Sequence, residues 1–181
     1  MNELNTLIAN KILKEELTYR LRNKYSVTQF CETVGITRGV FYRTYVDMPD
    51  MFCDVIQYNI RQHFRNHRNC DTEQIIFAFL EHIDQTRLFY TNIYHLVSKN
   101  KSRHICQEIR NTFFQELQKH LHSSKYSNVH IKSITSVLFS HVTDWLVHER
   151  EKNACDIYNE VRFMLAKKAW EKGCTWHPFS H

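Results

Sequence analysis

Glycine and proline are scarce in this 181-residue chain, and no other feature limits its fold as strongly. The sequence contains three glycines and two prolines, whereas turns and strand connections consume both residue types. Hydrophobic residues make up 43% of the chain and charged residues 24%, which is ordinary for a folded protein. We therefore predict an all-α protein built from about nine helices.

The composition also limits where the protein is expected to act. No apolar stretch approaches the ~20 residues of a membrane-spanning helix, so we expect no membrane contact. The N-terminal stretch mixes apolar residues with Glu3 and Lys11 and does not resemble an export signal. The six cysteines form no close pair, which predicts reduced thiols in the cytoplasm. The net charge of +5 permits nucleic-acid binding but does not identify it.

Helix signals are clearest near the N-terminus. Apolar spacing predicts a first helix over residues 3–22. Its apolar face would consist of Leu4, Ile8, Ile12, Leu17 and Leu21. Ser26 and Gln29 form a capping box that starts a second helix. Gly35 ends that helix, because a glycine can adopt the left-handed conformation that turns the chain sharply.

Further signals divide the rest of the chain. Thr37 caps a third helix that continues to Tyr45. Pro49 and the acids beside it mark the start of a fourth helix, which runs to about residue 68. Amphipathic spacing then predicts five more helices, over residues 71–85, 87–98, 102–122, 129–150 and 154–171.

The second and third helices, joined by a glycine turn, match the helix–turn–helix layout, whose second helix lies in the major groove of DNA. One set of side chains in this segment predicts a small core: Val27, Phe30, Val34, Ile36, Phe41 and Tyr45. Seven other residues of the segment are predicted to contact DNA: Thr28, Thr37, Arg38, Gly39, Val40, Tyr42 and Arg43. Hydroxyl and guanidinium groups are good phosphate donors, and a glycine permits close backbone approach.

The segment from Val34 to Tyr45, VGITRGVFYRTY, resembles the signature of TetR-family transcription regulators, in which a glycine turn precedes a Phe-Tyr pair. A helix start at Pro49-Asp50-Met51 lies at the distance that the family shows. The close similarity extends over residues 8–60, and the helical pattern beyond it agrees with the ligand-binding and dimerisation body of that family.

The resemblance implies a helix–turn–helix DNA-binding domain over residues 1–47. It implies a ligand-binding and dimerisation domain over residues 48–181, with the fourth helix, residues 48–68, as the connector. The expected protein is a homodimer that binds a roughly palindromic duplex. A small-molecule effector is expected to modulate its DNA affinity, with repression as the expected mode.

Two positions depart from the family pattern. Met48 replaces the lysine that commonly contacts a phosphate just before the fourth helix, and Val40 replaces a small hydroxyl residue or alanine. An alternative hypothesis follows, in which a TetR-like protein has lost DNA binding and acts as a ligand-sensing or protein-interaction coregulator. No Ser/His/Asp order, phosphate loop or paired-carboxylate motif stands out, so we expect neither an enzyme nor a cofactor.

The body offers two sets of candidate residues within the family picture. Aromatic side chains, with phenolic hydroxyls as orienting groups, would line an effector cavity: Phe79, Phe89, Tyr90, Tyr94, Phe113 and Phe139. Apolar side chains of the last two helices would pair with their copies in a homodimer: Leu138, Trp145, Val161 and Leu165. Packing inside a single chain is the alternative for both sets.

One further pattern competes with an organic effector. His63, His67 and Cys70 fall at helical spacing near the end of the fourth helix, and imidazole with thiolate suits Zn²⁺. Chance alignments are expected among twelve histidines, and no paired-cysteine motif accompanies these residues. We therefore predict no metal site and keep the three as the candidates for one. A redox-sensing thiol at Cys31 or Cys106 is a further alternative.

Overall fold

The structure, a computed structural model, describes residues 3–99, 103–121, 126–148 and 151–165. Within those ranges the chain forms nine α-helices, one short 3₁₀ helix and no strand, so the predicted all-α fold is confirmed. The elements are α1 (Glu3–Leu17), α2 (Val27–Val34), α3 (Arg38–Phe41), α4 (Met48–Asn66), α5 (Thr72–Gln85), α6 (Arg87–Lys99), α7 (Arg103–His120), α8 (Asn128–Val147), α9 (Ala154–Val161) and η1 (Arg162–Met164).

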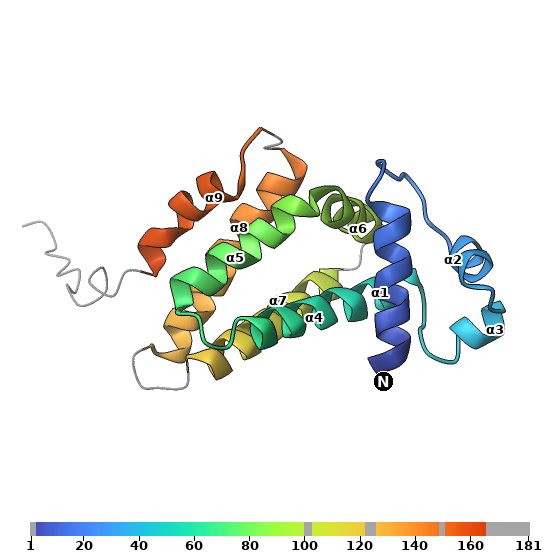
Figure 1. Ribbon diagram of the computed structural model, residues 1–181, viewed down its shortest axis with the longest axis horizontal. Helices are drawn as coiled ribbons and strands as arrows, with labels where there is room; N and C mark the ends of the chain where they lie inside the picture. The colour runs from blue at the N-terminus through green and yellow to red at the C-terminus, as the bar shows by residue number, and fades with distance from the viewer. Residues whose placement is uncertain (1–2, 100–102, 122–125, 149–150, 166–181) are drawn as a thin grey trace, which may run out of the picture.

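The helices divide into a small head and a larger body. Figure 1 shows α1, α2 and α3 gathered at one end of the molecule, with α9 at the opposite end. In the body, α4 packs along α7, α5 packs against α9, and α8 packs against both α7 and α9. The α1 helix crosses one end of α4 and also contacts α6. The α4 and α6 helices therefore connect the head to the body.

Phenylalanine rings from four helices fill the centre of the body. Phe113 of α7 is fully buried. Its ring centroid lies 5.2 Å from that of Phe64 of α4 and 4.9 Å from that of Phe79 of α5. The Phe139 ring of α8 lies 5.4 Å away on a tilt of 73°. Such edge-to-face contacts add to the stabilisation that burial of the rings already provides.

The first helix is shorter than predicted. It ends at Leu17, whereas apolar spacing extended it to residue 22. In a longer helix the Leu17 carbonyl would accept from the amide of residue 21; here it accepts from the side chain of Asn92 on α6, at 2.7 Å. The buried face also differs from the prediction. Leu17 is buried as predicted, but Ile8 is 44% and Leu21 51% exposed, and Ala9 and Leu13 are buried.

The second helix follows the prediction, and the third departs from it. Ser26 and Gln29 form the capping box of α2, and Gly35 ends it at a φ of 75°. The α3 helix is a single turn, whereas the prediction continued it to Tyr45. Beyond Phe41 the chain tightens into i→i+3 bonds, such as that from the Thr44 amide to the Phe41 carbonyl at 2.9 Å. Such bonds are a common way to finish a short helix.

The last helix is also shorter than predicted. The α9 helix ends at Val161 and continues as the 3₁₀ turn η1, whereas the prediction continued to residue 171. Side chains near the start of α8 occupy the carbonyls at this end: the His130 ring bonds the Met164 carbonyl at 3.2 Å. The rest of the predicted helix, residues 166–171, lies outside the described residues.

Candidate functional site

The helix–turn–helix is held by a small aromatic core. Phe30 of α2, Phe41 of α3 and Tyr45 are each at most 5% exposed. The ring of Phe41 lies 5.9 Å from that of Phe30 and 5.5 Å from that of Tyr45. The other predicted core residues, Val27, Val34 and Ile36, are half-buried and pack against the same cluster. This packing fixes α2 and α3 relative to each other.

All seven residues predicted to contact DNA are exposed, and they come from α2, α3 and the residues beside them: Thr28, Thr37, Arg38, Gly39, Val40, Tyr42 and Arg43. Tyr42 is 56% exposed although it neighbours the buried Phe41. Neither Arg38 nor Arg43 forms an ion pair within the part of the chain that the structure describes. Their guanidinium groups are therefore free to bind an external anion.

Three residues in or beside this segment, Thr37, Gly39 and Met48, differ in their structural roles. Thr37 uses its hydroxyl to cap α3, since Oγ1 accepts from the Val40 amide at 3.4 Å. Gly39 has no structural need to be glycine, because an added Cβ would meet only the Thr37 hydroxyl at 3.9 Å. Met48 is 6% exposed and packs in the core at the start of α4. This position therefore offers no surface contact to a phosphate.

A buried carboxylate attaches the head to α4. Asp54 of α4 accepts from the Thr6 hydroxyl of α1 at 2.6 Å and from the Tyr45 hydroxyl at 3.2 Å. All three side chains are buried. Burial raises the pKa of Tyr45, and the nearby Asp54 charge raises it further. The bond thus keeps the phenol protonated as a donor, and it joins three segments of the chain at one point.

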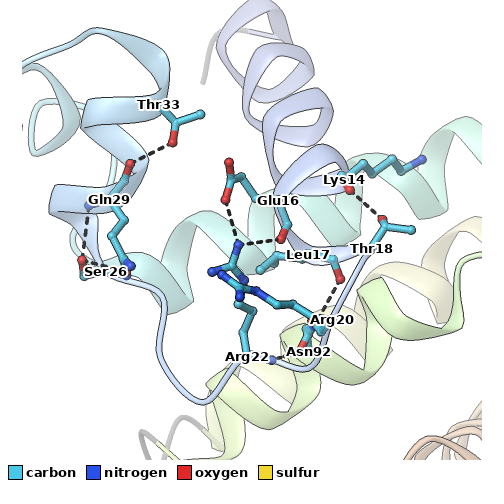
Figure 2. Close-up of polar contacts among 10 residues, drawn as sticks. All are labelled: Lys14, Glu16, Leu17, Thr18, Arg20, Arg22, Ser26, Gln29, Thr33 and Asn92. Carbon is cyan, nitrogen blue, oxygen red and sulfur yellow. Dashed lines mark hydrogen bonds and ion pairs between the residues drawn. The ribbon is translucent and has the colours of Figure 1, made fainter.

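A second buried polar residue attaches the α1–α2 linker to α6. Figure 2 shows Asn92, which is fully buried, at the end of α1. Its Nδ2 donates to the carbonyls of Leu17 and Arg20, at 2.7 and 2.8 Å. Its Oδ1 accepts from the Arg22 amide at 2.7 Å. Sequence reasoning missed this residue, although an asparagine among the apolar positions of a helix was the available signal.

The body contains an apolar cavity of about 100 Å³. Four of the six predicted effector residues line it, namely Phe79, Tyr90, Tyr94 and Phe139. The other two, Phe89 and Phe113, are fully buried in the core elsewhere. A cavity of this size is smaller than the roughly 300–1,000 Å³ of typical ligand pockets, so a ligand larger than a few atoms would have to open it.

A charged residue that sequence reasoning did not single out as a ligand contact also lines the apolar cavity. Arg110 of α7 contributes to its wall, and its Nε is buried without a hydrogen-bond partner among the described residues. Such an atom costs free energy until a partner reaches it. Tyr90, on the same wall, has a raised pKa because it is buried. An acceptor on a ligand would satisfy Arg110.

A larger cavity, which we call the polar cavity, lies between α1, α4 and α5 and measures about 330 Å³. Its lining is Leu7, Asn10 and Lys14 of α1, Tyr58, Asn59, Gln62, His63 and Asn66 of α4, the C-cap residue His67, and His82 of α5. Two of the three candidate metal ligands, His63 and His67, therefore lie here, and Cys70 does not. Among the described residues, no group of three or more His, Cys, Asp or Glu is placed to hold a metal ion.

The four predicted dimer residues lie inside the chain's own core. Leu138 and Trp145 of α8, Val161 of α9 and Leu165 are each at most 4% exposed. The Trp145 ring also stacks under the Arg87 guanidinium at 4.5 Å and donates to the Lys152 carbonyl. These side chains were assigned to an interface because an amphipathic face does not reveal its neighbour. A dimer formed by α8 and α9 would need the exposed side chains of these helices.

The two candidate redox thiols have different surroundings. Cys31 is buried in the head, and burial raises the pKa of its thiol. A raised pKa disfavours the thiolate that reacts with oxidants. Cys106 is half-buried and lines the apolar cavity beside Tyr94. Of the two, Cys106 is the thiol that a small molecule in the body would meet.

Comparisons with protein-family models, with curated proteins and with solved structures found no match to this chain. Among the described residues, no helix is both long enough and apolar enough to cross a membrane.

Proposed function

We propose that this chain is a TetR-like transcription regulator that binds DNA as a homodimer and whose DNA affinity is set by a small molecule. The observation that carries the proposal is the exposed surface of the capped helix–turn–helix. Five hydroxyl and guanidinium side chains of the predicted contact residues are exposed there, while Phe30, Phe41 and Tyr45 pack inside the segment. Such a surface suits an element that enters the major groove.

The individual residues suit different parts of that task. Arg38 and Arg43 form no ion pair with the residues that the structure describes, and their guanidinium groups can bind phosphates or guanine edges. Tyr42 exposes its phenol next to them and can donate to a phosphate. Gly39 leaves the backbone of α3 open to close approach by DNA. Because α3 is a single turn, few base contacts are available to one head, and a two-fold dimer would double them.

The connection between cavity and head supports an effector-controlled mechanism. The α6 helix carries Tyr90 and Tyr94 on the apolar cavity and Asn92 on the α1–α2 linker. The α4 helix carries Ile60 on the same cavity and Asp54 on the head. A ligand that enlarges the cavity would shift both helices, and it changes DNA affinity only if it binds one head arrangement better than the other.

One observation favours the alternative function, a ligand-sensing or protein-interaction module without DNA binding. Met48 is buried where the family commonly places a phosphate-binding lysine. Loss of one phosphate contact weakens binding by a limited factor, whereas loss of the whole function requires that the other contacts fail as well. The exposed Arg38 and Arg43 make the DNA-binding proposal the stronger of the two.

The proposal is tested by selection of bound sequences from a random duplex pool with the purified full chain. We expect enrichment of a roughly palindromic motif, and sedimentation of the free protein as a dimer. A pool that stays random after repeated rounds, at low as well as moderate salt, would contradict DNA binding and favour the alternative. A monomer that still enriches a single half-site would contradict only the dimer.

A further inference from the structure

The residues that line the polar cavity recur at helical spacing along the helices around it. On α1, Leu7, Asn10 and Lys14 follow one another at the spacing of a single helical face. The α4 helix contributes five residues, its C-cap residue His67 contributes a sixth, and α5 contributes His82. The cavity lies where the head helix α1 meets the body, and at about 330 Å³ it reaches the lower range of ligand pockets.

The lining carries basic and amide groups but no carboxylate. Lys14 is half-buried, and its ammonium makes no ion pair or hydrogen bond within the part of the chain that the structure describes. The side-chain amides of Gln62 and Asn66 are also without partners among those residues. Of the amide side chains that line the cavity, only those of Asn59 and Asn10 are hydrogen-bonded among the described residues. The Asn59 Nδ2 donates to the Asn10 Oδ1 at 3.2 Å. A cavity with several donors and no counter-charge is suited to an anion.

Burial, together with repulsion between neighbouring groups, disfavours the charged forms of titratable side chains in the polar cavity. Burial lowers the pKa of Lys14. Burial also lowers the pKa of His63 to about 4, and the nearby His67 and His82 lower it further. The pKa of His82 is lowered by burial first and then by Lys14 and His67. An anion among these groups would favour their charged forms and so oppose these shifts.

Each of two histidine rings in the polar cavity is oriented by a bond to a backbone carbonyl. The Nε2 of His63 bonds the Ile75 carbonyl at 2.9 Å, and the Nδ1 of His67 bonds the His63 carbonyl at 2.8 Å. Because a carbonyl only accepts, His63 Nε2 and His67 Nδ1 each carry a proton. The opposite nitrogens, His63 Nδ1 and His67 Nε2, become donors when the rings are protonated.

We propose that the polar cavity binds a small ligand carrying a doubly charged tetrahedral oxyanion, a phosphate or sulfate group, with the Lys14 ammonium as its counter-charge. Amide groups of Gln62 and Asn66 donate to its oxygens, and His63 and His82 take up protons as it binds. The volume beyond the oxyanion leaves room for a small organic part. This site is separate from the proposed DNA-binding surface and from the apolar cavity. Its test therefore requires neither DNA nor a ligand of the apolar cavity.

The test is calorimetric titration of the full chain with sulfate, which stays doubly charged from about pH 5.5 to about pH 7.5, at ionic strength held constant with chloride. We expect saturable binding that becomes tighter as the pH falls, because binding then needs less work to protonate the histidines. Titrations in two buffers of different ionisation enthalpy should report net proton uptake. Inorganic phosphate and glycerol phosphate, compared at one pH, distinguish the free ion from an ester.

Lys14→Gln should weaken sulfate binding by about tenfold or more, the effect of about 1.4 kcal/mol. The matched control is Lys11→Gln, since Lys11 is an exposed lysine of the same helix outside the cavity. If Lys14→Gln fails to fold, His82→Gln replaces it as the test, with loss of part of the proton uptake as the expected result.

Three results would overturn the proposal. The first is no sulfate binding above the chloride control, which would leave a water-filled cavity. The second is an equal loss of affinity in Lys14→Gln and Lys11→Gln, which would indicate general screening of surface charge. The third is stoichiometric zinc uptake that both His63→Gln and His67→Gln abolish, which would make the cavity a metal site.

Discussion

Two buried polar side chains, Asp54 and Asn92, attach the head to the body. Each reaches a segment distant in sequence and satisfies groups that would otherwise be buried without partners. Neither stands out in a search for DNA-binding or catalytic motifs, because each acts on partners from other segments. At the residue scale, these contacts are where the proposed coupling between cavity and head is most open to measurement.

Removal of the Asp54 carboxylate should destabilise the protein. Asp54→Ala leaves the hydroxyls of Thr6 and Tyr45 buried without their acceptor. Hydrogen bonds to a charged group contribute about 1.5–3 kcal/mol each, so we expect urea unfolding to report a loss of about 2–4 kcal/mol. Glu15→Ala, an exposed acid of α1, is the control and should change the unfolding free energy by less than about 0.5 kcal/mol. Equal stability of both variants would show that the carboxylate does not anchor the head.

His63 should make stability depend on pH in mildly acidic solution. The folded chain keeps this ring neutral down to a pKa of about 4, whereas the unfolded chain takes up a proton below about pH 6.5. The associated stability is therefore complete above pH 6.5 and is lost as the pH falls towards 4, by an amount on the order of 3 kcal/mol. Thermal melts in chloride buffers, free of phosphate and sulfate, measure the dependence.

His63→Gln cannot titrate and should flatten this pH dependence, although it lowers stability at neutral pH by removing a buried ring. His95→Gln replaces an exposed histidine and serves as the control, with the pH profile of the original chain. A profile that is equally steep in His63→Gln would assign the acid sensitivity to other groups.

At the element scale, the sequence predicted those helix ends that are determined locally. The capping box at Ser26 and Gln29 and the left-handed Gly35 involve residues within one turn of the helix, and both are present. The end of α1 was misplaced because it depends on Asn92, seventy-five residues from Leu17. The end of α9 was also misplaced; the 3₁₀ turn that follows it is bound by a side chain of α8, His130, which is distant in sequence.

The two glycines of the helix–turn–helix should respond differently to the same substitution. Gly35 has a φ of 75°, so Gly35→Ala should cost about 1–2 kcal/mol of unfolding free energy. Gly39 lies in a right-handed helix with open space around it, so Gly39→Ala should leave stability equal or raise it by a few tenths to about 1 kcal/mol. Chemical denaturation measures both.

The pair also separates stability from function. Under the proposed function, Gly39→Ala should weaken DNA binding without weakening the fold, because the added methyl stands between α3 and the duplex. If Gly39→Ala binds DNA as tightly as the original chain does, the α3 backbone does not approach DNA closely.

At the scale of the whole molecule, the all-α architecture was predictable, but the direction in which each apolar face points was not. Leu138, Trp145, Val161 and Leu165 form amphipathic stripes that suit a dimer interface or a core equally well, and the structure buries them in the core. Likewise, only the tertiary packing shows that Arg110 lines the apolar cavity and that Lys14 lines the polar cavity. The candidate DNA surface was predictable because it is built from one continuous segment.

The central claim, that the exposed surface of α2 and α3 binds DNA, is tested most directly by the salt dependence of affinity for a selected duplex. Fluorescence anisotropy should give a slope of log affinity against log salt that becomes shallower by about 0.9 for each phosphate contact removed. We predict this change in Arg43→Ala and a loss of sequence preference in Arg38→Ala. Arg162→Ala, which replaces an exposed arginine of η1 directly after α9, should match the unsubstituted chain. Identical slopes and affinities in all four proteins would contradict the account.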